Sequence, residues 1–112
     1  MIANKQKIAI GADHAGYELK EQIKKYLNAI NIDFQDYGTN STQSCDYPDI
    51  IHPLAKAINN EEFNLGIIIC GSGNGVNITA NKYVNVRSAL CWNEEIAELA
   101  RKHNDANILA MP

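Results

Sequence analysis

The strongest candidate for chemistry is Cys70, which stands between an apolar segment and a glycine-rich one. Residues 65–69 are nearly all large and apolar, which is typical of a strand buried on both faces of a parallel sheet. The three glycines of residues 71–75 allow a tight turn and a close approach of the backbone to a ligand. A helix that begins within this stretch would leave free N–H groups at one spot, where they can bind an anion and favour a thiolate.

The glycine-rich segment does not match the common phosphate-binding motifs. A dinucleotide fingerprint needs a third glycine where Val76 stands, and a P-loop needs Gly-Lys-Ser/Thr, which is absent. No Cys-x-x-Cys motif supports dithiol chemistry. Taken alone, Cys70 could equally be a small buried apolar residue. Cys91 has no glycine-rich loop after it, so we expect it to serve packing.

A second candidate is the pair Asp13 and His14, which follows a short apolar run at residues 7–11. That run predicts the first strand, and apolar residues at helical spacing follow over 17–30. The pair therefore lies at the carboxyl end of a strand, the edge where ligands bind in open α/β sheets. An exposed imidazole there can donate to a phosphate or hydroxyl, whereas Asp13 can also simply cap the helix.

The remaining patterns predict an alternation of strands and helices. Further strands are expected at residues 32–37, 65–69, 85–91 and 108–111, and helices at residues 48–59, from 76 onward, and at 94–102. This order predicts one domain over residues 1–112, with a three-layer α/β/α Rossmann-like fold around a five-stranded parallel sheet. No helix is predicted after the last strand. We therefore expect the fold to lack a C-terminal helix, leaving one face partly uncovered unless a partner completes it.

The composition argues against several classes of protein. A net charge of −3 gives no reason to expect nucleic acid or an anionic membrane as partner. No apolar run is long enough to span a bilayer, and residues 1–7 lack the apolar core of a signal peptide. The three widely spaced cysteines are typical of free thiols in a reducing compartment, which predicts a cytoplasmic protein. The cysteines and histidines do not lie at ligand spacing, so we expect no metal site.

Several short blocks together resemble the ribose-5-phosphate isomerase B family, to which galactose-6-phosphate isomerase subunits also belong. The resemblance covers nearly the whole chain from Lys7 onward. Its blocks are GADHAG at 11–16, DYP at 46–48, CGSGNG at 70–75, ANK at 80–82, LCWN at 90–93 and RKHNDAN at 101–107. It implies an intramolecular oxidoreductase of the pentose phosphate pathway that interconverts ribose 5-phosphate and ribulose 5-phosphate through an enediolate. It implies no metal or organic cofactor.

The resemblance also implies roles for individual residues. It makes Cys70 the base that moves a proton between C1 and C2, and His103 the acid that helps to open the furanose ring. It further implies a homodimer with shared active sites, which in some members pairs into a tetramer, so that Asn104 contacts substrate bound mainly by the facing subunit. The substrate-binding residues that it implies are Asp13, His14, Gly71, Ser72, Gly73, Asn74, Gly75 and Asn104.

Two alternatives remain open at this point. The chain could act on a hexose 6-phosphate, such as that of allose or galactose, by the same mechanism. It could also be a catalytically inactive sugar-phosphate-binding protein, because the phosphate-binding arginines of the family fall after the fifth strand, where this sequence ends. Galactose-6-phosphate isomerase subunits tend to lack either the cysteine or the histidine. The presence of both Cys70 and His103 therefore favours the pentose substrate.

Overall fold

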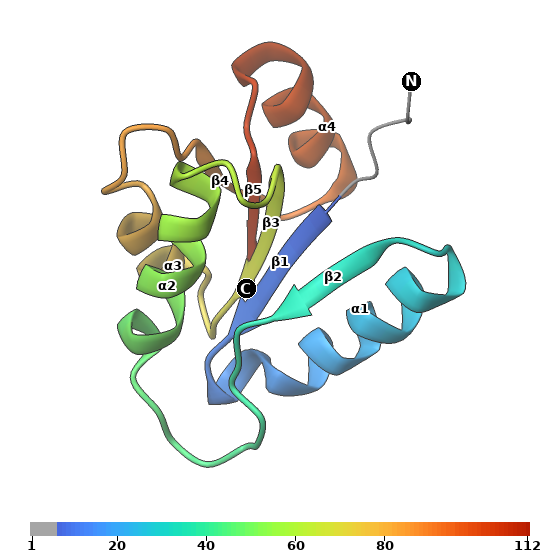
Figure 1. Ribbon diagram of the computed structural model, residues 1–112, viewed down its shortest axis with the longest axis vertical. Coiled ribbons are helices and arrows are strands. Elements are labelled where there is room, and N and C mark those ends of the chain that lie inside the picture. Colours follow the sequence, from blue (N-terminus) through green and yellow to red (C-terminus); the bar gives the residue numbers. More distant parts are fainter. Residues whose placement is uncertain (1–6) are drawn as a thin grey trace.

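Five parallel strands form one sheet at the centre of the fold, as the sequence predicts (Figure 1). The computed structural model describes residues 7–112, so residues 1–6, where we expect no signal peptide, lie outside the described residues. In the sheet the strands have the order β2-β1-β3-β5-β4, and all neighbours are parallel. They are β1 (Lys7–Ala12), β2 (Asp33–Asp36), β3 (Leu65–Ile69), β4 (Ser88–Leu90) and β5 (Ile108–Met111).

Helices connect the strands and complete three layers. A short 3-10 turn, η1 (His14–Gly16), precedes the first of them. Right-handed crossovers place α2 and α3 on one face of the sheet and α1 and α4 on the other. Figure 1 shows α2 and α3 side by side and α1 on the other side of the strands. The helices are α1 (Tyr17–Ala29), α2 (Tyr47–Asn59), α3 (Asn74–Ala80) and α4 (Glu94–Asn104).

The main apolar core lies between the sheet and the helices α2 and α3. Ile68 of β3 and Ala110 of β5 point into it, where they join Leu54 of α2 and Val76 of α3 in one cluster of buried side chains. Burying one such large aliphatic side chain contributes roughly 1.5–3 kcal/mol. This packing fixes the end of β3 against the start of α3, and so determines the shape of the glycine-rich loop between them.

The opposite face of the sheet is more open between α1 and α4. Ile67 and Leu109 are only half buried there, and α4 has no fully buried residue. A cavity of about 240 Å³ separates this part of the sheet from α4, and apolar side chains such as Leu65, Ala97 and Ala100 line it. Within the described residues no helix follows β5. The structure thus has the partly uncovered face that the sequence predicts.

Two predicted elements, the fourth strand and the last helix, have other bounds in the structure. The fourth strand is expected over residues 85–91 but forms only over Ser88–Leu90. Before this strand, amide side chains bind backbone N–H groups that a longer strand would use. Asn59 Oδ1 accepts from the Asn85 N–H and Asn107 Oδ1 accepts from the Arg87 N–H, both at 2.8 Å. The last helix continues two residues past its predicted end, to Asn104.

An ion-pair cluster joins α1 to β2. Lys20 of α1 is fully buried, and its Nζ lies 2.6 Å from Oδ2 of Asp36 at the end of β2. Lys24 reaches the same oxygen at 2.8 Å, and Glu21 contacts both lysines. Burial alone would raise the pKa of Asp36, but hydrogen bonds from Lys20, Lys24 and the Gly38 N–H outweigh it and hold this pKa below its usual 3.8.

This cluster predicts that acid weakens the fold. Hydrogen bonds from the lysines also lower the pKa of Glu21 below its usual 4.5. The two carboxylates therefore stabilise the fold fully above these usual values, and their contribution is lost as the pH falls through the lowered ones. Hydrogen bonds to Asp36 and Glu21 raise the pKa of Lys24 above 10.5, so its contribution is lost only as the pH rises beyond that value.

Urea unfolding between about pH 5.5 and pH 2.5 checks this prediction. The free energy of unfolding should fall with pH in the wild type, and Asp36→Asn should have a shallower acid slope because one titrating group is gone. Glu98→Gln, which breaks an exposed ion pair to Lys102 on α4, should keep the wild-type slope. Identical slopes for the wild type and Asp36→Asn would contradict the expected role of the cluster.

Candidate active site

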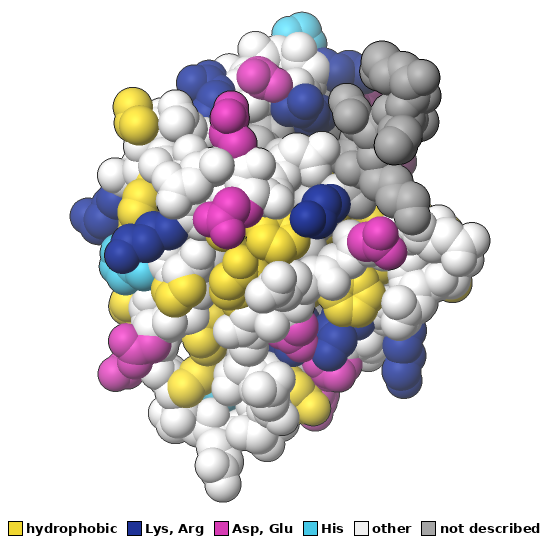
Figure 2. Space-filling model, viewed as in Figure 1, with side chains coloured by type: hydrophobic (Ala, Val, Ile, Leu, Met, Phe, Trp, Pro, Cys, Tyr) yellow, Lys and Arg dark blue, Asp and Glu magenta, His cyan; other side chains and the backbone are white. Residues whose placement is uncertain are grey.

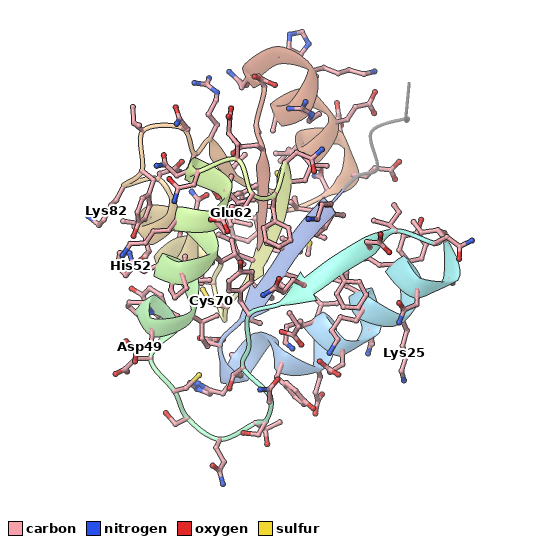
Figure 3. The ribbon with its side chains drawn as sticks, viewed as in Figure 1. Lys25, Asp49, His52, Glu62, Cys70 and Lys82 are labelled. Atoms are coloured by element: carbon pink, nitrogen blue, oxygen red, sulfur yellow. The ribbon has the colours of Figure 1, made fainter. Side chains whose placement is uncertain are left out.

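The two candidate segments, the Asp13–His14 turn and the loop at Cys70, meet between β1 and β3. There the connections that leave the two strands run in opposite directions along the sheet. From β1 the chain crosses over to β2 on one side, whereas from β3 it crosses to β4 on the other side. Such a switch point opens a crevice at the carboxyl ends of the two strands, where ligands bind in open α/β sheets. Ala12 of β1 pairs with Ile69 of β3 at the last position of their ladder. The residues that follow, Asp13 and Cys70, therefore lie at the same crevice, and Figure 3 shows Cys70 at the end of β3.

Cys70 lies where the apolar core meets this crevice. Its side chain is 6% exposed and belongs to the core cluster below α2 and α3. The loop folds back so that the Gly73 N–H donates a hydrogen bond to its Sγ at 3.1 Å. Burial at the loop limits the access of bulk water to the sulfur.

The glycine-rich loop carries further free donors. Gly71 and Ser72 are exposed, and the N–H of Asn74 donates to Ser72 Oγ at 3.2 Å. The N–H groups of Gly71, Ser72 and Gly75 have no acceptor among the residues described. Such donors at the start of a helix are suited to hold an anionic oxygen. Gly71, Ser72, Gly73, Asn74 and Gly75, all predicted as binding residues, are thus gathered around Cys70.

Gly73 occupies a place in this loop where both the backbone conformation and the surroundings favour glycine. Its φ of +76° lies in the left-handed region, and an added Cβ would come 2.5 Å from Leu90 Cδ1 and 3.0 Å from the Met111 carbonyl carbon. The left-handed conformation alone costs a residue with a Cβ about 1–2 kcal/mol. The tight fit explains how the N–H of Gly73 comes to face the sulfur of Cys70.

Gly73→Ala should therefore lower the free energy of unfolding by at least about 2 kcal/mol, from the strained backbone and the clash together. Gly71→Ala is the matched control, because its added Cβ would meet only Ala15 Cβ at an ordinary 3.8 Å. Urea unfolding of both variants measures the difference. Equal stability of the two variants would show that the loop can relax around a Cβ at position 73.

The Asp13–His14 turn forms the other wall of the crevice. Asp13 is nearly buried, and its Oδ1 accepts from the N–H groups of Ala15 at 3.0 Å and Gly16 at 3.1 Å. The capping role that the sequence allows is thus real, but it uses one carboxylate oxygen and leaves the other without a hydrogen-bond partner in the described part of the chain. Asp13 can therefore cap the turn and still accept from a sugar hydroxyl.

The ring of His14 has a defined orientation. Its Nδ1 accepts a hydrogen bond from the Cys45 N–H at 3.2 Å. A neutral imidazole that accepts at Nδ1 carries its hydrogen on Nε2. His14 is half buried, so Nε2–H can serve as a donor to a phosphate or hydroxyl oxygen. The position of His14 at the strand end predicts a donor role, and this orientation allows it.

Tyr47 is a candidate site residue that sequence reasoning alone does not identify. An added Cβ on Gly75 would lie 2.6 Å from its ring and 2.8 Å from its hydroxyl oxygen, so the phenol covers the loop directly. Tyr47 is the first residue of α2, and Pro48 favours the start of a helix there. The block at residues 46–48 was a possible signal, but only the fold shows that the start of α2 reaches the glycine-rich loop.

His103 and Asn104 lie at the opposite edge of the sheet. They form the last turn of α4, directly before β5 begins, whereas Cys70 follows the end of β3. Both are exposed. Arg87 holds this end of the helix, since its Nε donates to the Asn104 carbonyl at 2.7 Å. A single chain therefore brings together all the predicted site residues except these two.

The surface and the side-chain clusters add little to this picture. On the face shown in Figure 2, basic and acidic side chains are interspersed without a large patch of one sign. Among residues 7–112, no group of three or more His, Cys, Asp or Glu side chains is placed to hold a metal ion. Within the same residues, every helix is too short or too polar to cross a membrane.

Known proteins resemble this chain in both sequence and fold. A family model described as Ribose/Galactose Isomerase matches residues 8–112. A ribose-5-P isomerase B from Listeria innocua is 44% identical over 105 residues, which cover 94% of this chain and 71% of the relative. A ribose-5-phosphate isomerase B from Escherichia coli is 41% identical over 105 residues, covering 94% and 70%. The crystal structure of a ribose 5-phosphate isomerase from Thermotoga maritima matches with a TM-score of 0.94 and 47% identity, over 97% of this chain and 75% of that one.

Proposed function

Because the chain belongs to the ribose/galactose isomerase family, we propose that it interconverts ribose 5-phosphate and ribulose 5-phosphate through an enediolate. The main support is the position of Cys70 Sγ at the β1–β3 crevice, next to the backbone N–H groups of the glycine-rich loop. Moving a proton between adjacent carbons needs a base and a site for the oxyanion that forms, and this loop can supply both.

In the proposed reaction, the Cys70 thiolate removes the proton from C2 of the open-chain aldose. The electron pair of that C–H bond forms the C1=C2 double bond, and the negative charge moves to the oxygen on C1. The N–H groups of Gly71, Ser72 and Gly75 bind this oxygen. The proton of the C2 hydroxyl passes to the oxygen on C1, which leaves the negative charge on the oxygen of C2. The thiol then returns its proton to C1 while the oxygen on C2 becomes the ketose carbonyl. The reaction is redox-neutral within the substrate, so we propose no cofactor.

Three side chains of the same subunit would position the sugar. The Nε2–H of His14 would donate to a hydroxyl or to the phosphate, and the free oxygen of Asp13 would accept from a hydroxyl. Tyr47 covers the loop and would present its hydroxyl to the substrate. Pre-placed donors and acceptors of this kind hold the reacting carbon near the base.

We assign His103 and Asn104 to the site of a facing subunit. A two-fold axis repeats each contact in both directions, so an edge that is remote from Cys70 within one chain can meet the Cys70 crevice of the other. His103 of the partner subunit would then act as the acid that opens the furanose ring. We accordingly propose a homodimer with two shared sites, which could pair further into a tetramer.

The reaction would belong to the pentose phosphate pathway, and we propose a cytoplasmic location. The location is supported by Cys45, Cys70 and Cys91, which are all free thiols, as is usual in a reducing compartment. A hexose 6-phosphate remains a second candidate substrate, because the matching family includes galactose isomerases by its description.

Turnover followed by NMR on ribose 5-phosphate, allose 6-phosphate and galactose 6-phosphate tests the proposed function. We expect ribulose 5-phosphate to form with a kcat/KM at least about tenfold above that for either hexose phosphate. Preferred turnover of a hexose phosphate would move the assignment to the second candidate. Binding of all three without turnover, in the protein at its natural length, would instead identify a binding protein.

A further inference from the structure

A buried charge lies close to the crevice but outside the proposed chemistry. Lys20 is the largest of the fully buried side chains, and its ammonium group contacts the carboxylates of Asp36 and Glu21. A buried ion pair is a poor source of net stability, because the cost of removing two charges from water can exceed their attraction. Protonating one partner would still weaken the fold, but replacing both charges by apolar groups need not, so stability alone does not account for this pair.

The two carboxylate oxygens of Asp36 accept hydrogen bonds from different partners. Oδ2 accepts from Lys20 at 2.6 Å and from Lys24 at 2.8 Å. Oδ1 accepts from the N–H of Gly38 at 2.8 Å. The lysines thus hold one oxygen and turn the other toward Gly38, where the loop from β2 to α2 begins.

Gly38 in turn fixes the strand end that carries the site. The Ala12 N–H donates to the Gly38 carbonyl, and the Thr39 N–H donates to the Ala12 carbonyl, both at 2.7 Å. Ala12 is the last residue of β1 and directly precedes Asp13. A series of hydrogen bonds therefore runs from buried Lys20 through Asp36 and Gly38 to Ala12, the residue before the Asp13–His14 turn.

The same loop contacts the site again at its far end. Cys45 donates to His14 Nδ1, and two residues later Tyr47 covers Gly75. Figure 1 shows this loop passing beneath the carboxyl ends of β1 and β3. Fixing its start at Gly38 therefore constrains the segment that orients both His14 and Tyr47.

We propose that Lys20 and Asp36 are positioning residues, whose ion pair holds the β2–α2 loop and the Asp13–His14 turn in the geometry that binds the sugar phosphate. This inference rests on the proposed function for its substrate, but the orientation of His14 can be tested without one. A misplacement of about 1 Å can cost on the order of a hundredfold in rate, so a lost hydrogen bond at Gly38 should be measurable.

Three variants separate this role from simple stability. In Asp36→Asn, the single oxygen is drawn to Lys20 and the amide NH₂ faces the Gly38 N–H, so the Gly38 bond is lost. In Lys20→Met/Asp36→Asn, no buried ammonium competes, and the oxygen can accept from Gly38 again while Lys24 turns to solvent. In Lys20→Met/Asp36→Leu, the charges are gone and no acceptor remains, although packing is kept. The two double variants thus differ mainly in the acceptor for Gly38.

Steady-state kinetics with ribose 5-phosphate, measured well below each melting temperature, gives the first readout. We expect KM to rise about tenfold or more in Asp36→Asn and in Lys20→Met/Asp36→Leu, and to stay within about threefold of wild type in Lys20→Met/Asp36→Asn. Glu98→Gln, which breaks an exposed ion pair by the same kind of change, should stay within about twofold. Equal KM values for the two double variants would overturn the proposal, and their comparison suffices if Asp36→Asn does not fold.

The imidazole signals of His14 in ¹⁵N NMR, recorded without substrate, give the second readout. They should change in Asp36→Asn and in Lys20→Met/Asp36→Leu but match wild type in Lys20→Met/Asp36→Asn. Wild-type signals in all three variants would refute the positioning role even if the wild type proved inactive on ribose 5-phosphate. Inactivity of the wild type with the expected pattern of signals would instead count against the proposed function alone.

Discussion

Cys70→Ala should lower kcat for ribose 5-phosphate isomerisation by at least about a hundredfold, because it removes the base and leaves none in its place. Binding should change little, since the donors that hold the sugar are the backbone of residues 71–75 and the side chains of Asp13 and His14. Turnover by NMR and titration calorimetry with ribose 5-phosphate measure the two effects separately.

Cys91→Ala is the matched control for this variant. Cys91 is as buried as Cys70, at 5% against 6% exposed, and it directly follows β4 as Cys70 follows β3. Burial raises the pKa of the Cys91 thiol, and its Sγ contacts the Ala89 carbonyl, so it has none of the features of a base. We expect kcat within about threefold of wild type for this control. Similar losses in both variants would indicate that each cysteine serves only packing.

Two inactive variants should restore activity to one another when they are mixed. His103→Ala alone should lose about a hundredfold or more in rate, as expected for a general acid. In a dimer with shared sites, a Cys70→Ala subunit paired with a His103→Ala subunit has one doubly altered site and one intact site. Random reassortment makes half of the dimers mixed, so about a quarter of the wild-type activity should return.

Unfolding and refolding an equimolar mixture, followed by an activity assay, measures this recovery. Each variant refolded alone is the control and should remain inactive. If Cys70 and His103 acted within one chain, each subunit of the mixed dimer would still carry a defective site and no activity would return. Recovery therefore distinguishes a shared site from two separate ones. Within one chain, His103 and Cys70 lie at opposite ends of the strands, so only a shared site would bring them together.

The order of the elements follows from local patterns, and so it could be predicted. The apolar runs at residues 65–69 and 108–111 have the same bounds in the sequence and in the structure, because an asparagine precedes each run and a glycine or proline follows closely. The fourth strand is shorter than predicted because amide side chains far along the chain, those of Asn59 and Asn107, bind its backbone. No local pattern contains that information.

The end of α4 shows a similar limit. Helices commonly end before a glycine, but here Asp105 adopts the left-handed conformation with φ of +50° and its N–H donates to Ala100. Aspartate tolerates that conformation better than most residues, yet it is a weak signal in a sequence. A helix that ends at residue 102, as predicted, would place His103 in the following loop, whereas it lies in the last helical turn.

The site was predictable where it follows strand ends and not where it depends on tertiary contacts. Asp13, Cys70 and the glycine-rich loop could be placed at one edge because the carboxyl ends of parallel strands meet there. The contact between Tyr47 and Gly75 and the bond from Cys45 to His14 depend on the path of the β2–α2 loop. The Lys20–Asp36 pair that fixes this path joins residues sixteen positions apart on two different elements.

Hydrogen exchange during turnover tests the role of Cys70 most directly. With ribose 5-phosphate in D₂O, the base acquires deuterium from solvent and returns it to carbon, so the wild type should introduce deuterium at C1 of ribulose 5-phosphate and C2 of ribose 5-phosphate. Proton NMR follows both positions. Cys70→Ala should bind the sugar phosphate yet show exchange at least about a hundredfold slower. Exchange at the wild-type rate in Cys70→Ala would mean that another group removes the proton.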